Sequence, residues 1–595
     1  MLDVFVKRFA FSQSGSRVLL KIRAYGTYAL YVNRVKVCWF SKTAGDWKKV
    51  RSFDITGYIN QDAENSITAC VGNHNGPPLL WLRVDGLEPH IGSDPSWLVS
   101  SADSMPVQAV IADDTMLPPG SLAGPGPWPS LLSELPLLTV FFICSLGAFL
   151  FAKRLAAKGL LKPKAVSVWA LAFVALALGY TFGHNLPRLP WWRGFDVKGH
   201  VEYIKRLADG GGLPLATDGW EMYNPPLFYA LAAAIYKVFC LMFRDAAYSF
   251  YGLKVISFAS GIGQAALAYI ASGLVFPAEE KKRAASVVFA GALPMNMYMS
   301  QYISNESLAA MLASASLVCA FWIIKKEKPS ATPFILLGFL LGATLLTKMT
   351  VLVLIPVIIL ALIADCVKKK AGLRKTAVFI ACALVPAALV CGWFYIRNWI
   401  YFGNPFITNM DPATGVGWWM DPGFHTFKYF TGFGMVFKAP FFSGFHSFWD
   451  GIYSTLWGDA LCGGSAAFQF RPGWNYNFMP LVYLLSVPAS IAILTGIYSA
   501  LRNFVMRGDV AGLLIFAPVC LFGFAITTLA LEKPYYAIPK AFYGLFLEVP
   551  LALAFATGIG RTDDWLKDKG FNAGRAVLYG WFGTLVLSIL FAFYI

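Results

Sequence analysis

Residues 166–182 read VSVWALAFVALALGYTF, and residues 191–229 follow with WWRGFDVKGHVEYIKRLADGGGLPLATDGWEMYNPPLFY. The first stretch is a continuous apolar run with the composition of a membrane-spanning helix. The second carries Asp196 and His200 at the i, i+4 spacing of one helix face, then Glu221 and a stop at Asn224–Pro226. Titratable side chains at the mouth of an apolar span indicate chemistry at a membrane surface.

The composition of the whole chain is that of a membrane protein. Of its 595 residues, 57% are hydrophobic and 16% aromatic, and its mean hydropathy is +0.57. Spans of such a chain must be helical, because a helix satisfies its own backbone hydrogen bonds in lipid. The formal charge of +16 comes from short basic clusters between apolar runs, which is typical of membrane topology signals and disfavours a nucleic-acid partner.

The sequence predicts a polytopic α-helical protein with about 12–13 transmembrane helices. We expect spans near residues 136–152, 166–183, 254–276, 285–303, 307–324, 333–346, 349–366, 376–396, 480–500, 511–530, 541–558 and 576–594. One further apolar run, 225–243, begins with two prolines, which suit a helix N-terminus. We interpret it as an interfacial or re-entrant helix.

The basic clusters predict the orientation of the chain. They lie at 153–164, 281–283, 325–328, 368–375, 502–507 and 561–575, and all six share one face if 225–243 does not cross. That face is expected to be cytoplasmic. The loops 184–253 and 397–479 then lie outside the cytoplasm. A site there would use no cytosolic nucleotide, in agreement with a sequence that contains no P-loop and no GxGxxG motif.

Residues 1–115 differ from the rest of the chain. Short β-type runs separated by turn residues predict an all-β sandwich, followed by a Pro/Gly-rich linker at 116–135 and a transmembrane domain at 136–595. The sandwich is expected outside the cytoplasm with the loops. Cys38 and Cys70 lie in this region, where they either form a disulfide or remain buried thiols. No Cys or His spacing indicates a zinc site.

Residues in the first loop are the candidates for acid–base chemistry. Asp196 is a candidate general base toward an acceptor hydroxyl, or else an ordinary helix-capping or solvated aspartate. His200 is expected to orient Asp196, to bind a phosphate, to join a metal site or to make a structural hydrogen bond. Glu221, pinned before the prolines, is a second acid, a sugar-hydroxyl acceptor or an exposed carboxylate. Asn224 belongs to the same turn, and Trp220 suits either an aromatic belt or stacking on a sugar.

Cations at the expected outer ends of the spans are candidates for phosphate binding. Lys348 interrupts two apolar runs, Arg397 closes one, and Lys540 flanks another. Such groups could hold a lipid phosphate as it leaves, or they could reach toward water. Asn305 and Glu306 lie at another expected outer turn, where helix capping is the alternative to substrate binding.

The first loop resembles that of the GT-C superfamily of glycosyltransferases, with protein O-mannosyltransferases and aminoarabinose lipid A transferases as the nearest groups. The residues that carry the resemblance are DVKGHVEYIKRLADGGGLP (196–214), GWEMYNPPLFYAL (219–231), MYMSQYISNESLAAMLASASL (297–317), LLTKMTVLVLIPV (345–357) and GWFYIRNWIYFGNPF (392–406). It spans roughly residues 160–560. It implies a polyprenyl-phosphate sugar donor, a site outside the cytoplasm and inversion of the anomeric centre.

The same resemblance implies that Asp196 is the catalytic carboxylate. Many relatives carry an acidic pair at this point, whereas here Asp196 is followed by Val197. A second carboxylate would have to come from elsewhere, with Glu221 as the candidate. No cofactor is obligatory in such enzymes, although some relatives need a divalent cation. The acceptor would be a lipid, a protein or a polysaccharide, and the location a bacterial-type inner or plasma membrane.

The N-terminal stretches GTYALYVNRVKV (26–37) and SFDITGYINQDAENSITACVGN (52–73) resemble galactose-binding-type jelly rolls that accompany rhamnosidases. Such modules bind sugars or act as spacers. Trp39, Trp47 and Trp81 are candidate sugar platforms. Two alternatives to an enzyme remain: a transporter or flippase of lipid-linked glycans, which would need polar or broken helices at mid-bilayer, and a non-catalytic glycan-binding assembly subunit.

Overall fold

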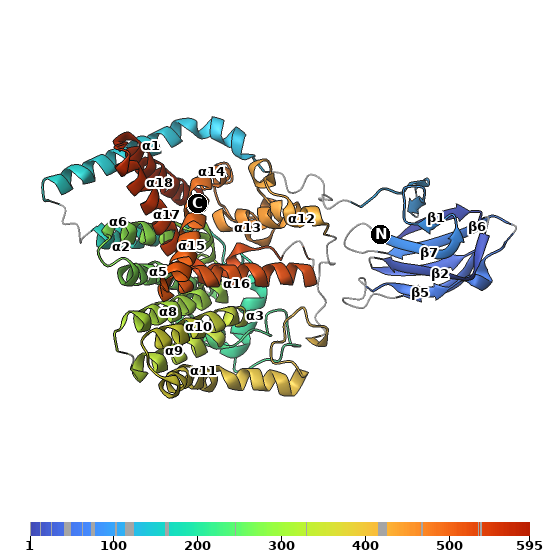
Figure 1. Ribbon diagram of the computed structural model, residues 1–595, viewed down its shortest axis with the longest axis horizontal. Helices are drawn as coiled ribbons and strands as arrows, with labels where there is room; N and C mark the ends of the chain where they lie inside the picture. Colours follow the sequence, from blue (N-terminus) through green and yellow to red (C-terminus); the bar gives the residue numbers. More distant parts are fainter. Residues whose placement is uncertain are drawn as a thin grey trace. The chain divides into compact units, whose positions relative to one another are not determined.

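The structure is a computed structural model of the chain (Figure 1). It describes all residues except 1, 12, 25, 41–48, 62, 73–77, 102–103, 113–123, 161–165, 244–245, 329, 415–424, 466–467, 534 and 536–537. The chain divides into two compact units. The first comprises Met1–Met116 with Gly417–Thr426, and the second comprises Leu117–Val416 with Phe427–Ile595.

The N-terminal unit is an antiparallel β-sandwich, which confirms the predicted all-β fold. One sheet has the order β10-β9-β1-β6-β3-β4 and the other the order β5-β2-β7-β8. The strands are β1 (Leu2–Phe9), β2 (Gln13–Ala24), β3 (Thr27–Val32), β4 (Val35–Phe40), β5 (Arg51–Asp54), β6 (Asn65–Gly72), β7 (Leu80–Glu88), β8 (Ile91–Gly92), β9 (Leu98–Ser101) and β10 (Val107–Gln108).

Period-2 alternation explains the sandwich core. In β3, TYALYV, every second side chain is buried, and its partner β6 alternates in the same way. Leu30, Ile67 and Val84 are fully buried between the sheets. Asn65 is buried as well, and its side chain bonds Asn33 and the Asn60 backbone, so it fixes the turn before β6. The described Cys38 and Cys70 are free thiols.

The second unit is helical. Its α-helices are α1 (Pro127–Ala157), α2 (Val166–Asn185), α3 (Val197–Ala208), α4 (Leu227–Met242), α5 (Ala246–Val275), α6 (Glu280–Ala292), α7 (Pro294–Met299), α8 (Asn305–Lys325), α9 (Ala331–Leu345), α10 (Leu354–Lys368), α11 (Leu373–Phe402), α12 (Phe427–Thr431), α13 (Phe448–Trp457), α14 (Met479–Leu485), α15 (Val487–Arg507), α16 (Val510–Glu532), α17 (Glu548–Asp568) and α18 (Asn572–Ala592).

Ten helices among the described residues are long and apolar enough to cross a membrane. The polytopic helical class is therefore confirmed, with fewer full-length spans than the 12–13 expected. Two apolar helices, α4 and α9, have only 16 and 15 residues. At about 1.5 Å per residue they fall short of the roughly 30 Å of a hydrocarbon core.

Two segments differ from the expected elements. The predicted span 285–303 is broken into α6 and α7 at Leu293, whose backbone is extended because Pro294 follows it. The helix α1 begins at Pro127, inside the stretch expected to be a linker up to residue 135. Prolines at 127 and 129 suit a first helical turn, where no backbone donor is needed, and Pro136 lies within the helix.

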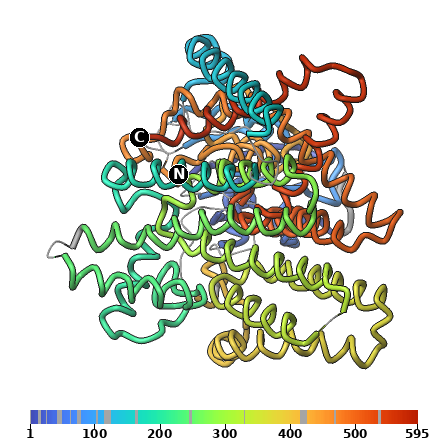
Figure 2. The backbone as a smooth tube through the Cα atoms, turned by 90° about the vertical axis from the view of Figure 1, so that its left-hand side faces the viewer, coloured from blue at the N-terminus to red at the C-terminus, as the bar shows by residue number. Residues whose placement is uncertain are grey.

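Small residues set the helix packing. A Cβ on Gly496 of α15 would lie 1.9 Å from the Ala554 carbonyl of α17, and one on Gly558 would lie 2.0 Å from the Ala492 carbonyl. These two helices therefore touch backbone to backbone, as is common for membrane helices. Helices α8 to α11 form another group of neighbours (Figures 1 and 2), and α1 lies along α18.

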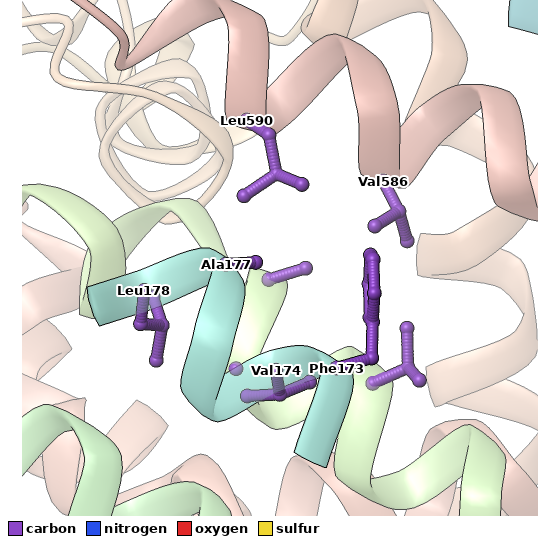
Figure 3. A pocket seen from close by; sticks show the side chains of 9 residues that line it. Phe173, Val174, Ala177, Leu178, Val586 and Leu590 are labelled. Carbon is purple, nitrogen blue, oxygen red and sulfur yellow. The ribbon is translucent and has the colours of Figure 1, made fainter. Parts of the chain in front are cut away.

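A small gap between α2, α6 and α18 is lined only by apolar residues, among them Phe173, Val174 and Leu590. Figure 3 shows side chains of α2 facing Val586 and Leu590. The gap borders Gly291, where a Cβ would collide with Val174. Because no polar group lines it, it has no part in the chemistry considered below.

Candidate functional site

Asp196 lies at the N-terminus of α3 with its side chain exposed. Its backbone is left-handed, with φ 55° and ψ 17°, a conformation that Asp and Asn tolerate better than most residues. The carboxylate makes no capping hydrogen bond to α3. It instead accepts a bond from Trp220 Nε1 at 3.0 Å. Asp196 is therefore not a side-chain cap of α3. Its side chain is exposed, and the Trp220 indole orients it.

Glu221 is buried, not exposed. Asn224 Nδ2 donates to its Oε2 at 2.6 Å and to its backbone carbonyl at 3.1 Å. Burial raises the pKa of Glu221 well above its usual range, and the nearby Asp196 raises it further. The turn is fixed because Pro225 and Pro226 follow Asn224, and because Leu227 N donates to a carbonyl at the end of α9.

His200 points into the protein beside Glu221. Its Nδ1 lies 2.8 Å from Tyr229 OH and 3.8 Å from Glu221 Oε2. Burial lowers the pKa of His200 to about 3, although Asp196 opposes that shift. The imidazole is therefore neutral. Among the described residues, no group of three or more His, Cys, Asp and Glu side chains is arranged to hold a metal ion.

Asn305, Glu306 and Lys348 extend the buried network. Asn305 Nδ2 donates to Asn224 Oδ1 at 3.1 Å, and Lys348 Nζ donates to Asn305 Oδ1 at 3.3 Å. Lys348 also pairs with Glu306 Oε1 at 2.7 Å. Burial alone would lower the pKa of Lys348, but the Glu306 carboxylate raises it above the usual range. The α8 cap is Ser304, so Asn305 and Glu306 are not cap residues but parts of this buried network.

Lys540 packs against Phe195, the residue before Asp196. Its Nζ is 5.6 Å from the Phe195 ring centroid, 5.5 Å from that of Phe542 and 5.3 Å from that of Tyr543. It also donates a long bond of 3.5 Å to Tyr543 OH. Three aromatic faces thus surround this ammonium group. No carboxylate pairs with it within the described residues, so its charge is available to an anion.

Arg397 is placed apart from these contacts. Its guanidinium donates to the backbone carbonyls of Leu213 and Pro214 at 3.1 and 2.9 Å. It also stacks on Tyr401. The side chain therefore holds the loop that follows α3. Of the ten residues named from the sequence, nine lie at or beside the first loop and its buried network, and Arg397 supports that loop from another side.

The sequence did not predict the contacts that hold the segment before Asp196, which run through Tyr302 to Asp459 and Trp474. Tyr302 OH donates to Asp459 Oδ2 at 2.6 Å, and Trp474 Nε1 donates to the same oxygen at 3.0 Å. Tyr302 packs on Phe195, and a Cβ on Gly194 would lie 2.6 Å from its ring. Only the adjacent glycines 463 and 464 hinted at a close backbone approach here.

The described tryptophans of the sandwich differ in exposure. Trp39 on β4 is 63% exposed, whereas Trp97 is core. Trp81 carries Arg23 over its ring at 5.1 Å, which occupies that face. Trp47, the third candidate sugar platform, lies outside the described residues. Trp39 is therefore the described platform candidate with an open side.

Comparison with known proteins finds similarity among solved structures only: no protein-family model and no curated protein matches. An α-L-rhamnosidase from Streptomyces avermitilis is 18% identical, covering 18% of this chain and 11% of that one, with a TM-score of 0.16. The Archaeoglobus fulgidus oligosaccharyltransferase is 14% identical, covering 71% and 53%, with a TM-score of 0.42. ArnT from Cupriavidus metallidurans is 15% identical, covering 68% and 79%, with a TM-score of 0.33.

The chain thus spans about half of the oligosaccharyltransferase and a small part of the rhamnosidase.

Proposed function

We propose that this protein is a membrane glycosyltransferase that takes a sugar from a polyprenyl-phosphate donor and transfers it to an acceptor hydroxyl outside the cytoplasm. The observation that carries the proposal is an exposed carboxylate, Asp196, which accepts from Trp220 Nε1 at 3.0 Å. Lys540, which pairs with no carboxylate among the described residues, lies over the ring of the adjacent Phe195. A base and an anion-binding cation side by side are what phosphate displacement by a hydroxyl requires.

In the proposed reaction, Asp196 accepts the proton of the acceptor hydroxyl. The acceptor oxygen attacks the anomeric carbon, and the bond from that carbon to the phosphate oxygen breaks. The polyprenyl phosphate leaves with the bonding electron pair. A single displacement of this kind inverts the anomeric centre. Little acid assistance is needed, because the phosphate is already a stable leaving group.

The cations divide into two roles. Lys540 is the proposed contact for the leaving phosphate, because no described carboxylate neutralises it. Lys348 is already paired with Glu306 and bonded to Asn305, so we assign it to positioning. Glu221 is buried with a raised pKa, and we assign it to holding the turn that carries Trp220, not to a second base.

Substitution of Asp196 by Asn tests the proposal. Asn keeps the left-handed backbone and the acceptor oxygen for Trp220 but removes the base. We expect the transfer rate from labelled polyprenyl-phosphate sugars to fall by about 10²-fold or more. The matched control is Asp209→Asn, an exposed aspartate that follows the other end of α3. Transfer by Asp196→Asn at the wild-type rate would remove Asp196 from this role.

A transporter of lipid-linked glycans is the second candidate, and one observation favours it. The break between α6 and α7 places Asn296 against the buried Glu548 of α17, with Asn296 Nδ2 3.3 Å from its Oε1. Broken helices with polar groups are features of transporters. Donor movement across vesicles without formation of a glycosidic bond would support this function over transfer.

A further inference from the structure

A polar cavity lies in the helical unit, away from Asp196. Its volume is about 540 Å³. It lies where the C-terminal ends of α5 and α15 meet the start of α16 and the middle of α17. The lining residues are Val275, Phe276, Glu279, Lys282, Ala500, Arg502, Asn503, Met506, Arg507, Asp509, Gly512, Ile515, Thr557 and Arg561. This volume is in the range of small-molecule sites.

The charges in this cavity are unbalanced. Lys282 pairs with Glu279, and Asp509 caps α16 by accepting from Ala511 N. The remaining cations, Arg502, Arg507 and Arg561, have no carboxylate partner within the described part of the chain. A guanidinium group can donate two parallel hydrogen bonds to two oxygens of one phosphate, which is bidentate binding. The cavity therefore offers three such groups to an anion.

One wall of the cavity is apolar. Val275 ends α5 and Phe276 follows it, Met506 lies near the end of α15, and Ile515 lies in the first turns of α16. The Lys282 ammonium lies over the Phe276 ring at 5.6 Å. An inorganic anion would bind the arginines but would make no contact with this apolar wall. A ligand that carries both a phosphate and an apolar chain uses both parts of the lining.

The cavity and the Asp196 site lie at opposite ends of the same helices. Lys254 near the start of α5 bonds the Leu189 carbonyl, close to the loop of Asp196, whereas Val275 at its other end lines the cavity. At about 1.5 Å per residue these ends are roughly 30 Å apart, which is one hydrocarbon thickness. The arginines belong to the basic clusters expected on the cytoplasmic side, where anionic lipids gather.

We propose that this cavity binds the phosphate of an anionic amphiphile, with the arginines on the phosphate and the apolar wall against the chain. The lipid headgroup is the favoured source of that phosphate over a soluble phosphate ion. Such binding would not depend on the transferase reaction.

The test uses the full-length protein in a zwitterionic detergent. Binding of dioctanoyl phosphatidic acid, dioctanoyl phosphatidylcholine and inorganic phosphate is measured by microscale thermophoresis. We expect phosphatidic acid to bind at least about tenfold more tightly than the other two, and more weakly as salt rises. The double variant Arg502→Gln with Arg561→Gln should weaken phosphatidic acid binding by about tenfold or more, because two charge-assisted contacts are lost.

Two further variants keep the test decisive. Replacing the same two arginines by lysine should restore most of the affinity, because the charge returns. Replacing Arg374 and Lys375 by Gln removes two exposed cations of another basic cluster and should leave the affinity for phosphatidic acid unchanged. Equal binding of inorganic phosphate and phosphatidic acid would overturn the lipid source. Unchanged phosphatidic acid binding in the folded double variant would overturn the site.

Discussion

At the scale of single residues, Lys348 and Glu306 form the ion pair at the centre of the buried network, 2.7 Å apart. Lys348→Met would leave Glu306 as an unpaired buried carboxylate, at a cost of about 3–5 kcal/mol. We expect a marked fall in the thermal midpoint. Adding Glu306→Gln should recover most of that stability, because no charge is then left without a partner. A double variant no more stable than Lys348→Met would show that the pair does not matter for folding.

His200 makes the stability of the helical unit depend on pH. Its pKa is lowered by burial to about 3, so the folded state keeps it neutral while the unfolded state binds a proton below about 6.5. Its stabilising contribution is therefore present above pH 6.5 and is lost as the pH falls. Between pH 7.5 and pH 5.0 this loss amounts to about 2 kcal/mol.

The comparison of thermal midpoints at pH 7.5 and pH 5.0 checks this expectation. Asn at position 200 retains a polar group near Nδ1 but does not titrate, so His200→Asn should lose less stability on acidification than the wild type. His90→Asn, at an exposed site in the sandwich, should behave like the wild type. Identical pH dependence of all three proteins would contradict the assignment.

The sequence predicted which residues would lie close together better than it predicted the contacts that each would make. Asp196, Glu221, Asn224 and Lys348 could be named because charged or polar groups beside apolar runs are rare. Their roles depended on burial and on partners from distant segments, which spacing does not encode. Asp459, in the second long loop, could not be distinguished from other loop acids, because its contacts with Tyr302 and Trp474 are purely tertiary.

At the scale of elements, α3 and the turn at 220–224 fit together through a glycine. A Cβ on Gly199 would lie 2.8 Å from Glu221 Cγ and 3.3 Å from Trp220 Cδ1. Gly199→Ala should therefore displace both side chains and destabilise the protein by about 1–3 kcal/mol. Gly179→Ala on α2, where a Cβ meets nothing within 4 Å, should be neutral or stabilising.

Thermal midpoints of the two variants, together with transfer rates, test this fit. Because Trp220 bonds Asp196, Gly199→Ala should reduce transfer as well as stability. Equal stability of the two alanine variants would contradict this fit, because the turn at 220–224 would then move without any loss in the free energy of unfolding.

The types of the elements could be predicted from the periodicity of apolar residues. Where the helices begin and end depended on single prolines, whose effect the sequence pattern did not reveal. Alternation in the sandwich strands predicted an all-β unit, and apolar runs predicted the helices. The break at Leu293 was missed because the run 285–303 is apolar on both sides of Pro294. The early start of α1 was missed because prolines read as linker residues also suit a first helical turn.

At the scale of the whole molecule, the chain combines a sandwich and a helical unit whose charged sites lie at opposite ends of α5. The distribution of Lys and Arg predicts that Asp196 and the sandwich face outward and that the arginine cavity faces the cytoplasm. This orientation decides which donor can reach Asp196, because a cytosolic nucleotide sugar would not meet an outward site.

Cysteine labelling in intact cells tests this orientation. Lys198→Cys on α3, Trp39→Cys on β4 and Lys567→Cys near the end of α17 each place one thiol at an exposed position. The exposed cysteines and the half-buried ones are first replaced by Ser; these are Cys144, Cys240, Cys520, Cys38, Cys70 and Cys382. A membrane-impermeant maleimide should label the first two from outside and the third only after permeabilisation. Labelling of position 198 only after permeabilisation would place Asp196 with the cytosolic nucleotide pool and rule out a donor presented outside the cytoplasm. Labelling of position 567 from outside would remove the arginine cavity from the anionic leaflet that its charge is proposed to serve.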